Sequence, residues 1–444
     1  MKLRLKRWYF FAIAGLFAVG LIALLTFRHY TSVQVIRPPD NATAEVESPL
    51  TFAKEDRPFW RGPSTRDDTV IPATLPEWNA QEHLIWKIAV EGLGHSSPIV
   101  CGEKLFLTTA DGESIRLLAF DRKTGGAIWN TELHRGGLMA KHEKNSHASA
   151  TPACDGERIY AAYAANDAIH VVAVEPNGHI AWRREAGPFV SEWGYGSSVI
   201  IDGARIFVVG DNRGSKLGRI RATSFLTALD RSNGEIIWRI PRPEDRSYST
   251  PHLAGNAESG TLIMAGPRGV FGYSKRNGDQ FWNVPWAPTR SANSPDVVGG
   301  VAVISGAFPS KETLCLRWDK NAQGDRVVWR LKGIGGDVPS PLIVGKRVYV
   351  PEDNGVVVCV ALDDGHTLWK ERIASGGISS SPISIADKLY LADESGTIHE
   401  FRDADEYELI ASHKLGEPIL ATPVVSDGRM YVRTMKHLWC FGRK

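Results

Sequence analysis

One pattern recurs along the chain from about residue 80, and no other feature of the sequence constrains the fold as strongly. Each copy opens with Ser/Thr-Pro and a short apolar strand, passes through two further strands, and ends with a Gly turn and a strand that contains Trp. A clear copy runs SSPISIADKLYLADESGTIHEF. A period in the forties with four short strands in each copy is typical of a propeller blade.

Two markers give the number of copies. The Ser/Thr-Pro marker occurs seven times, and the run GSSV at Ser198 fills the one missing position. Its prolines are Pro98, Pro152, Pro251, Pro295, Pro341, Pro382 and Pro423. The eighth copy carries Ala411 where the others have tryptophan. The repeat tryptophans are Trp86, Trp129, Trp182, Trp238, Trp282, Trp329 and Trp369. Eight copies predict an all-β propeller of eight blades.

The phase of the repeat predicts how the ring closes. The chain enters with a lone Trp strand, LIWKIAV, before the first Ser-Ser-Pro, and it leaves after the third strand HLWCFG with no fourth. We therefore expect the N-terminal strand to complete the last blade. This closure would hide two open sheet edges.

The N-terminal residues predict a membrane anchor. Residues 1–7 form a basic stub, and the uncharged run 8–27 spans about 30 Å as a helix, which is the thickness of a bilayer core. Basic residues before a span stay in the cytoplasm. We expect one transmembrane helix in the bacterial inner membrane and a periplasmic propeller, with a cleaved signal peptide as the alternative. Residues 28–58 are predicted as an extended linker and residues 59–444 as the propeller.

Charge and cysteine content restrict the function. The formal net charge is +2, and the first 28 residues hold five Lys/Arg and no acid, so the exported part is slightly acidic. That part therefore lacks the excess of basic residues that nucleic-acid binding requires. The five cysteines are odd in number and lack CxxC spacing, so we expect buried single thiols and no metal site.

No catalytic motif is present. GxSxG, HExxH and a Walker loop are all absent. His142 and His147 are the nearest approach to a metal-ligand cluster, but five residues of loop between them do not direct both rings at one ion. We expect no catalytic residue.

The repeat resembles the PQQ-like propeller repeats of quinoprotein dehydrogenases and of the propeller lipoprotein in bacterial outer-membrane assembly machinery. The likeness covers about residues 59–442, and it is strongest to exported bacterial propellers that open with a WRGP element, here FWRGP at 59–63. It implies an eight-bladed ring in which the repeat tryptophans dock between neighbouring blades. Burying such a ring contributes a few kcal/mol.

The same resemblance raises the question of a cofactor. Family enzymes that use PQQ add an adjacent Cys-Cys disulfide, a bound calcium ion and a catalytic Asp. Adjacent cysteines are absent here, and neither the calcium ligands nor that Asp can be assigned to a motif. We expect neither PQQ nor calcium, and a PQQ-dependent quinoprotein oxidoreductase is the alternative function.

Long loops indicate a partner surface. In each blade, the connection between the second and third strands lies on the same face as the connection to the next blade. The long connections on this face are 130–147, 183–196, 210–222 and 239–249. Long loops on a rigid scaffold often carry function. Candidate residues on this face are His142, His147, Trp193, Tyr195, Arg213, Arg219 and Arg221. The predicted function is a noncatalytic, monomeric, membrane-tethered module that binds a protein or polymer in the cell envelope. Insertions without a partner are the alternative.

The anchor prediction can be tested by fractionation. The mature protein should begin at or near Met1 and stay with membranes after a carbonate wash, because a 20-residue apolar helix does not leave the bilayer at high pH. N-terminal sequencing that starts near residue 30 would contradict it.

Overall fold

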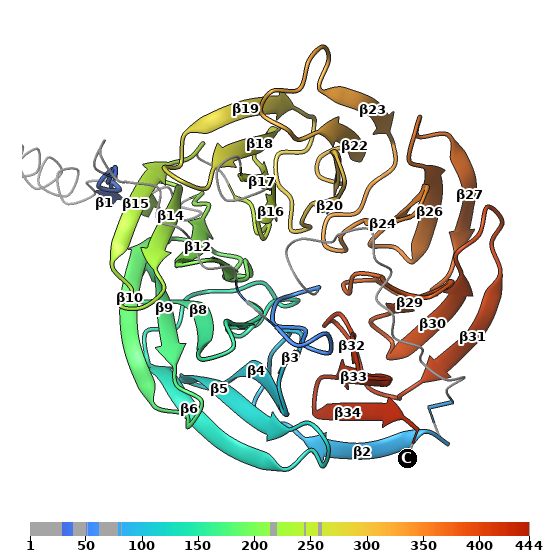
Figure 1. The fold of residues 1–444 in the computed structure, drawn as a ribbon, viewed down its shortest axis with the longest axis horizontal. Coiled ribbons are helices and arrows are strands. Elements are labelled where there is room, and N and C mark those ends of the chain that lie inside the picture. Colours follow the sequence, from blue (N-terminus) through green and yellow to red (C-terminus); the bar gives the residue numbers. More distant parts are fainter. Residues whose placement is uncertain are drawn as a thin grey trace, which may run out of the picture.

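The computed structural model describes residues 29–38, 50, 52–61, 79–80, 82–213, 220–243, 246–255 and 260–443. Eight antiparallel sheets of four strands each stand radially around a central channel, as predicted (Figure 1). No helix among these residues is long and apolar enough to cross a membrane. The predicted span 8–27 lies outside the described residues.

The first four blades follow each other along the chain, with the first strand innermost (Figure 1). Blade 1 contains β3 (Ile99–Cys101), β4 (Lys104–Asp111), β5 (Ser114–Asp121) and β6 (Ala127–Arg135). Blade 2 contains β7 (Ala153–Cys154), β8 (Ile159–Ala165), β9 (Ala168–Val174) and β10 (Ile180–Pro188). Blade 3 contains β11 (Ile200–Asp202), β12 (Arg205–Gly210), β14 (Phe225–Asp230) and β15 (Ile236–Pro241). Blade 4 contains β16 (His252–Ala254), β17 (Thr261–Gly266), β18 (Gly269–Ser274) and β19 (Gln280–Pro285).

The remaining blades repeat this order. Blade 5 contains β20 (Asp296–Val298), β21 (Val301–Gly306), β22 (Glu312–Arg317) and β23 (Val327–Lys332). Blade 6 contains β24 (Leu342–Val344), β25 (Arg347–Pro351), β26 (Val356–Ala361) and β27 (Thr367–Arg372). Blade 7 contains β28 (Ile383–Ile385), β29 (Lys388–Ala392), β30 (Thr397–Arg402) and β31 (Leu409–Lys414). Blade 8 contains β32 (Val424–Ser426), β33 (Arg429–Arg433), β34 (His437–Gly442) and β2 (Leu84–Ala89).

Strand β2 closes the ring from the other end of the chain. It pairs antiparallel with β34, with Trp86 opposite Cys440, and becomes the outer strand of blade 8. The predicted closure is therefore confirmed. The core lies between neighbouring blades: Phe207 and Trp238 of blade 3, for example, pack in one buried cluster with Met264 of blade 4.

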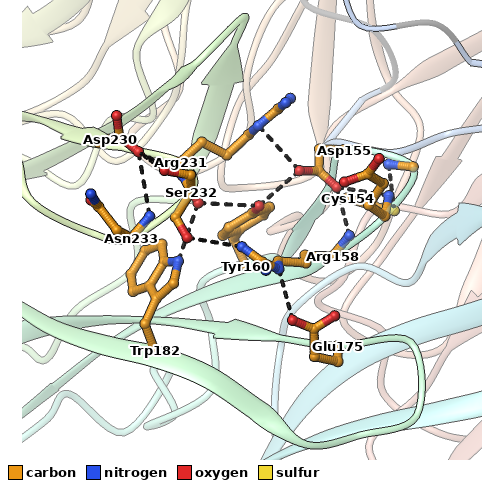
Figure 2. Close-up of polar contacts among 12 residues, drawn as sticks. Cys154, Asp155, Arg158, Tyr160, Glu175, Trp182, Asp230, Arg231, Ser232 and Asn233 are labelled. Carbon is orange, nitrogen blue, oxygen red and sulfur yellow. Dashed lines mark hydrogen bonds and ion pairs between the residues drawn. The ribbon is translucent and has the colours of Figure 1, made fainter.

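The repeat tryptophans lie at these interfaces. Figure 2 shows Trp182 of blade 2, whose indole N–H donates to the carbonyl of Arg231 in the last turn of blade 3 at 3.1 Å. A Cβ added to the turn residue Gly234 would lie 2.6 Å from the Trp182 ring. The tryptophan of one blade thus requires the glycine of the next. The same indole bond to the following blade, at 2.7–3.3 Å, is made by Trp129, Trp238, Trp282, Trp329 and Trp369.

Polar contacts reinforce the interface that Figure 2 draws. Arg158 of blade 2 pairs with Glu175 at 2.9 Å and donates to the carbonyl of Ser232 in blade 3 at 2.9 Å. Asp155 accepts from the hydroxyl of Tyr160 at 2.7 Å. Of these three bonds, the one from Arg158 to Ser232 crosses from blade 2 to blade 3, and the other two lie within blade 2.

Part of the stretch predicted as a linker, 28–58, contacts the ring. Strand β1 (His29–Thr31) pairs in parallel with β13 (Ile220–Ala222), which lies in the loop between β12 and β14. Ile36 then exchanges backbone hydrogen bonds of 3.0 and 2.9 Å with Arg239 on β15. The chain therefore runs along the outer edge of blade 3 before residue 39.

A second segment, 52–61, crosses the central channel. Arg57 exchanges backbone hydrogen bonds with Val100 of blade 1, and the carbonyl of Pro58 accepts from Cys154 of blade 2 at 2.9 Å. The guanidinium of Arg61 reaches the carbonyl of Pro341, before blade 6, at 2.9 Å. This segment, which includes the first residues of FWRGP, thus reaches from blades 1 and 2 to the start of blade 6.

The structure corrects the cysteine prediction in part. Cys101 and Cys154 form a disulfide, whereas Cys315, Cys359 and Cys440 are buried thiols as expected. The two bonded cysteines end the innermost strands of blades 1 and 2, where the sheets converge on the axis and their Cα atoms are 6.6 Å apart. The 53-residue separation conceals this proximity, because it equals about one repeat.

Trp238 provides the test of interblade docking. Its side chain has no exposed surface, so Trp238→Ala should lower the free energy of unfolding by about 3–5 kcal/mol. Trp129→Ala serves as the matched control and should cost less, because Trp129 is only half-buried in the same position of blade 1. Equal denaturation midpoints for wild type and Trp238→Ala would contradict this account.

Candidate functional site

A belt of hydroxyl groups surrounds the channel at the start of every innermost strand. Each belt residue is the Ser or Thr at the marker position of the repeat, and in seven of the eight the backbone N–H donates to the hydroxyl of the next blade's belt residue at 2.9–3.0 Å. The members, none more than 9% exposed, are Ser97, Thr151, Ser198, Thr250, Ser294, Ser340, Ser381 and Thr422. Seven such bonds join the eight blades in order around the described ring.

The belt explains why the marker is Ser/Thr-Pro. A β-hydroxyl at this position accepts the N–H of the preceding blade, and a buried N–H without an acceptor is costly. Proline follows at most positions because it has no N–H of its own to satisfy at the channel edge. The marker is thus an interblade bond rather than a turn signal.

A cavity of about 560 Å³ lies above the belt, at the end of the channel where the long loops meet. Its wall contains all belt residues except Ser340, and Trp60 of the crossing segment is part of its lining. Volumes of this size are usual for small ligands or inserted side chains. We call this cavity and its surrounding loops the channel mouth.

The rim of the mouth is built around Trp193. The ring of His142, from the loop between blades 1 and 2, stacks on it with centroids 4.7 Å apart. Arg246, from the loop between blades 3 and 4, lies 4.8 Å from the Trp193 ring centroid. The carbonyl of Trp193 accepts from the side-chain amide of Asn145 at 2.6 Å. Loops of three different interblade connections are therefore held together at one aromatic ring.

A second cation continues the rim toward blades 5 and 6. Arg290 lies 4.2 Å from the centroid of the Phe308 ring and pairs with Asp337 at 3.0 Å. Burial raises the pKa of Asp337 above the usual carboxyl value, and Arg290 opposes that shift. Burial also raises the pKa of the Tyr248 phenol to about 12, so this hydroxyl is neutral at physiological pH.

The predicted partner-face residues are divided by the structure. His142 and Trp193 line the cavity together, whereas His147 is half-buried and does not line it. Tyr195 is buried against Phe189, with ring centroids 5.4 Å apart. Arg213 is exposed in the loop after β12. Arg219 and the side chain of Arg221 lie outside the described part of the chain.

Sequence reasoning missed many residues of the mouth. Several lie in short connections or in the crossing segment, among them Trp60, His95, Arg290, Phe308 and Asp337. One signal was present: Trp60 belongs to the FWRGP element, which stands outside the repeat and so has no role within a blade. The short loops give no comparable signal, because only ring closure brings them together.

The acids at the mouth do not fit a calcium–quinone site. Asp353 accepts the backbone N–H groups of Asp337 and Val338 at 2.7 and 3.0 Å, one with each oxygen, and Asp337 is paired with Arg290. Within the described ranges, no three His, Cys, Asp or Glu side chains are grouped so as to hold a metal.

A family profile described as "Outer membrane protein assembly factor BamB" matches residues 57–185, 116–371 and 353–441. The chain belongs to this family of PQQ-like propellers. It is 26% identical over 383 residues to the protein of that name from Bordetella pertussis, covering 81% of this chain and 86% of the relative. With the Yersinia pestis protein the identity is 22%, over 83% of this chain and 91% of the relative.

Solved structures show the same fold. BamB from Moraxella catarrhalis superposes with a TM-score of 0.57 at 12% identity, over 81% of this chain and 97% of that chain. Quinohemoprotein alcohol dehydrogenase from Comamonas testosteroni superposes with a TM-score of 0.61 at 12% identity, over 91% of this chain and 82% of that chain. A fold shared by an assembly factor and an oxidoreductase does not decide the chemistry, which depends on the site.

The belt can be tested at Ser381. Ser381→Ala removes the acceptor of the Ser340 N–H and should lower the free energy of unfolding by about 1–3 kcal/mol. Ser381→Thr keeps the hydroxyl and should be nearly neutral, because Thr occupies the belt at positions 151, 250 and 422. Chemical denaturation measures both, and equal losses for the two variants would refute the role of the hydroxyl.

Proposed function

We propose that this protein is a noncatalytic, membrane-tethered binding module that presents the channel mouth to a protein partner in the bacterial cell envelope. The observation that carries the proposal is the rim at Trp193, where His142 and Arg246 from separate loops pack on one indole. Tryptophan and arginine held rigidly at a rim are the residue types that dominate binding energy at protein interfaces.

Two further observations support the envelope location. The relatives from Bordetella pertussis and Yersinia pestis are named outer membrane protein assembly factors. The disulfide between Cys101 and Cys154 suits an oxidising compartment such as the periplasm, since such bonds are rare in the cytosol.

Residues 29–37 bear on the orientation of the ring. β1 pairs with β13 on the face of the mouth, and Arg37 then reaches Asp279 in the last turn of blade 4, on the opposite face, at 2.5 Å. Only residue 28 separates β1 from the end of the predicted span at residue 27. An anchor at 8–27 would therefore hold the mouth toward the inner membrane.

The proposed function can be tested by cross-linking the full chain in envelope membranes and isolating the partner. Arg246→Glu should abolish capture of the wild-type partner with little change in melting temperature, because it places an acid against the Trp193 face. Lys123→Glu is the matched control, since Lys123 is exposed in a turn on the opposite face.

Two outcomes would reject this function. Capture that survives Arg246→Glu would place the binding surface elsewhere on the ring. Retention of added PQQ together with substrate-dependent dye reduction would favour the quinoprotein oxidoreductase instead.

A further inference from the structure

Arg433, at the end of β33 in blade 8, is a buried cation without an acidic partner. Its side chain is 2% exposed, and its Nη1 donates to the carbonyls of Ser96 and Thr108 and to the Ser96 hydroxyl at 2.6–3.1 Å. No carboxylate of the described residues lies within ion-pair distance, and burial lowers the pKa of Arg433 to about 9. Arg242, equally buried, is by contrast bonded to both oxygens of Asp211 at 2.9 and 3.0 Å.

An unpaired buried charge is expensive, and proteins usually pair or remove it. Gly94 makes room for the Arg433 guanidinium, because an added Cβ would lie 2.4 Å from its Nη2. The next residue, His95, lines the mouth. The positive charge of Arg433 is thus held directly behind the wall of the cavity, where a bound anion would offset it.

The pKa of His95 indicates the sign of the electrostatic potential at this wall of the mouth. Burial, followed by the charges of Arg433 and Lys141, lowers the pKa of His95 to about 4, and Glu394 acts in the opposite direction. The imidazole is therefore neutral at pH 7. The cations that face it outnumber the single facing acid, so an anion at this wall meets a net positive field.

The same sector already holds one carboxylate. Glu394, in the loop between β29 and β30 of blade 7, accepts from Lys144 at 3.0 Å through each oxygen and from the Ser379 hydroxyl at 2.7 Å. Lys144 comes from the loop between blades 1 and 2 and is half exposed. The belt hydroxyls of Ser97 and Thr422 line the sector and donate to no other described residue.

We propose that the sector of the mouth between blades 7 and 1, walled by His95, Ser97, Thr422 and Lys144 and backed by Arg433, binds a carboxylate of an acidic segment of the partner protein. The incoming carboxylate pairs with Lys144, either beside Glu394 or in its place. It also accepts hydrogen bonds from the belt hydroxyls of Ser97 and Thr422. This inference rests on the proposed function, since it supplies the chemistry of the protein partner.

The test uses the full chain in lipid nanodiscs of zwitterionic lipid and a capped peptide of alternating Glu and Gly, followed by calorimetry. The Glu peptide should bind, and its Gln counterpart should not. Histidine NMR should show the pKa of His95 rising on binding, because a nearby anion favours the imidazolium. Affinity should accordingly increase as the pH falls from 7 to 5, because the bound anion favours protonation of His95, whose pKa without the anion is about 4.

Lys144→Gln should weaken peptide binding about tenfold, the usual effect of losing a charged hydrogen-bond donor. Lys123→Gln is the matched control, because Lys123 makes an exposed 3.0 Å pair with Glu103 on the opposite face, and it should change nothing. Arg433→Gln should also reduce affinity, but its burial makes misfolding an expected complication. The surface variant Lys144→Gln keeps the proposal falsifiable in that case.

Three results would overturn the carboxylate subsite: equal binding of the Glu and Gln peptides, unchanged affinity in Lys144→Gln, or an unchanged pKa of His95. If inorganic phosphate binds as tightly as the Glu peptide, the ligand of the subsite is a small oxyanion and not an acidic segment of a protein. If the peptide fails while Arg246→Glu still abolishes partner capture, the subsite is wrong and the proposed function stands.

Discussion

The ring depends on one hydrogen bond that is repeated seven times around the channel, from the backbone N–H of a belt residue to the hydroxyl of the next blade's belt residue. Sheets that radiate from an axis have their innermost strands closest together, so any polar group there is buried and must find a partner across a blade boundary. The hydroxyl of Ser or Thr meets that demand within one residue. Farther out, the indole N–H of the repeat tryptophan forms a second interblade bond over the turn glycine. Two concentric sets of bonds thus hold the blades in register.

The belt also determines what the mouth can be. Seven of the eight belt hydroxyls accept from the preceding blade, and each keeps its own proton for a further hydrogen bond, which the accepted bond strengthens. The crossing segment contributes Trp60 to the cavity lining. The long loops then need only supply the rim, where the rings and cations around Trp193 gather. Binding groups on a rigid frame lose little entropy on association, which suits a recognition surface.

Much of the architecture could be predicted because the same residue types recur at the same positions of each repeat. The eight copies, the closing strand and the interval between Gly and Trp all reflect bonds between sequence neighbours or between equivalent positions of successive blades. The predictions about the mouth were less complete. His142 and Trp193 stood out as residues of long loops, but Arg290, Asp337 and Phe308 lie in connections of ordinary length. Nothing in their local sequence distinguishes them from turn residues elsewhere on the ring.

The sequence by itself therefore determined the blade, the number of blades and the way the ring closes, because each depends on a residue type at a repeated position. Only the tertiary structure decided the contacts between positions that do not repeat: the disulfide of Cys101 with Cys154, the crossing of the channel by residues 52–61, and the unpaired charge of Arg433 behind His95. Ring closure brings together segments hundreds of residues apart around one axis. Their proximity follows from the geometry of the whole ring, and no local pattern encodes it.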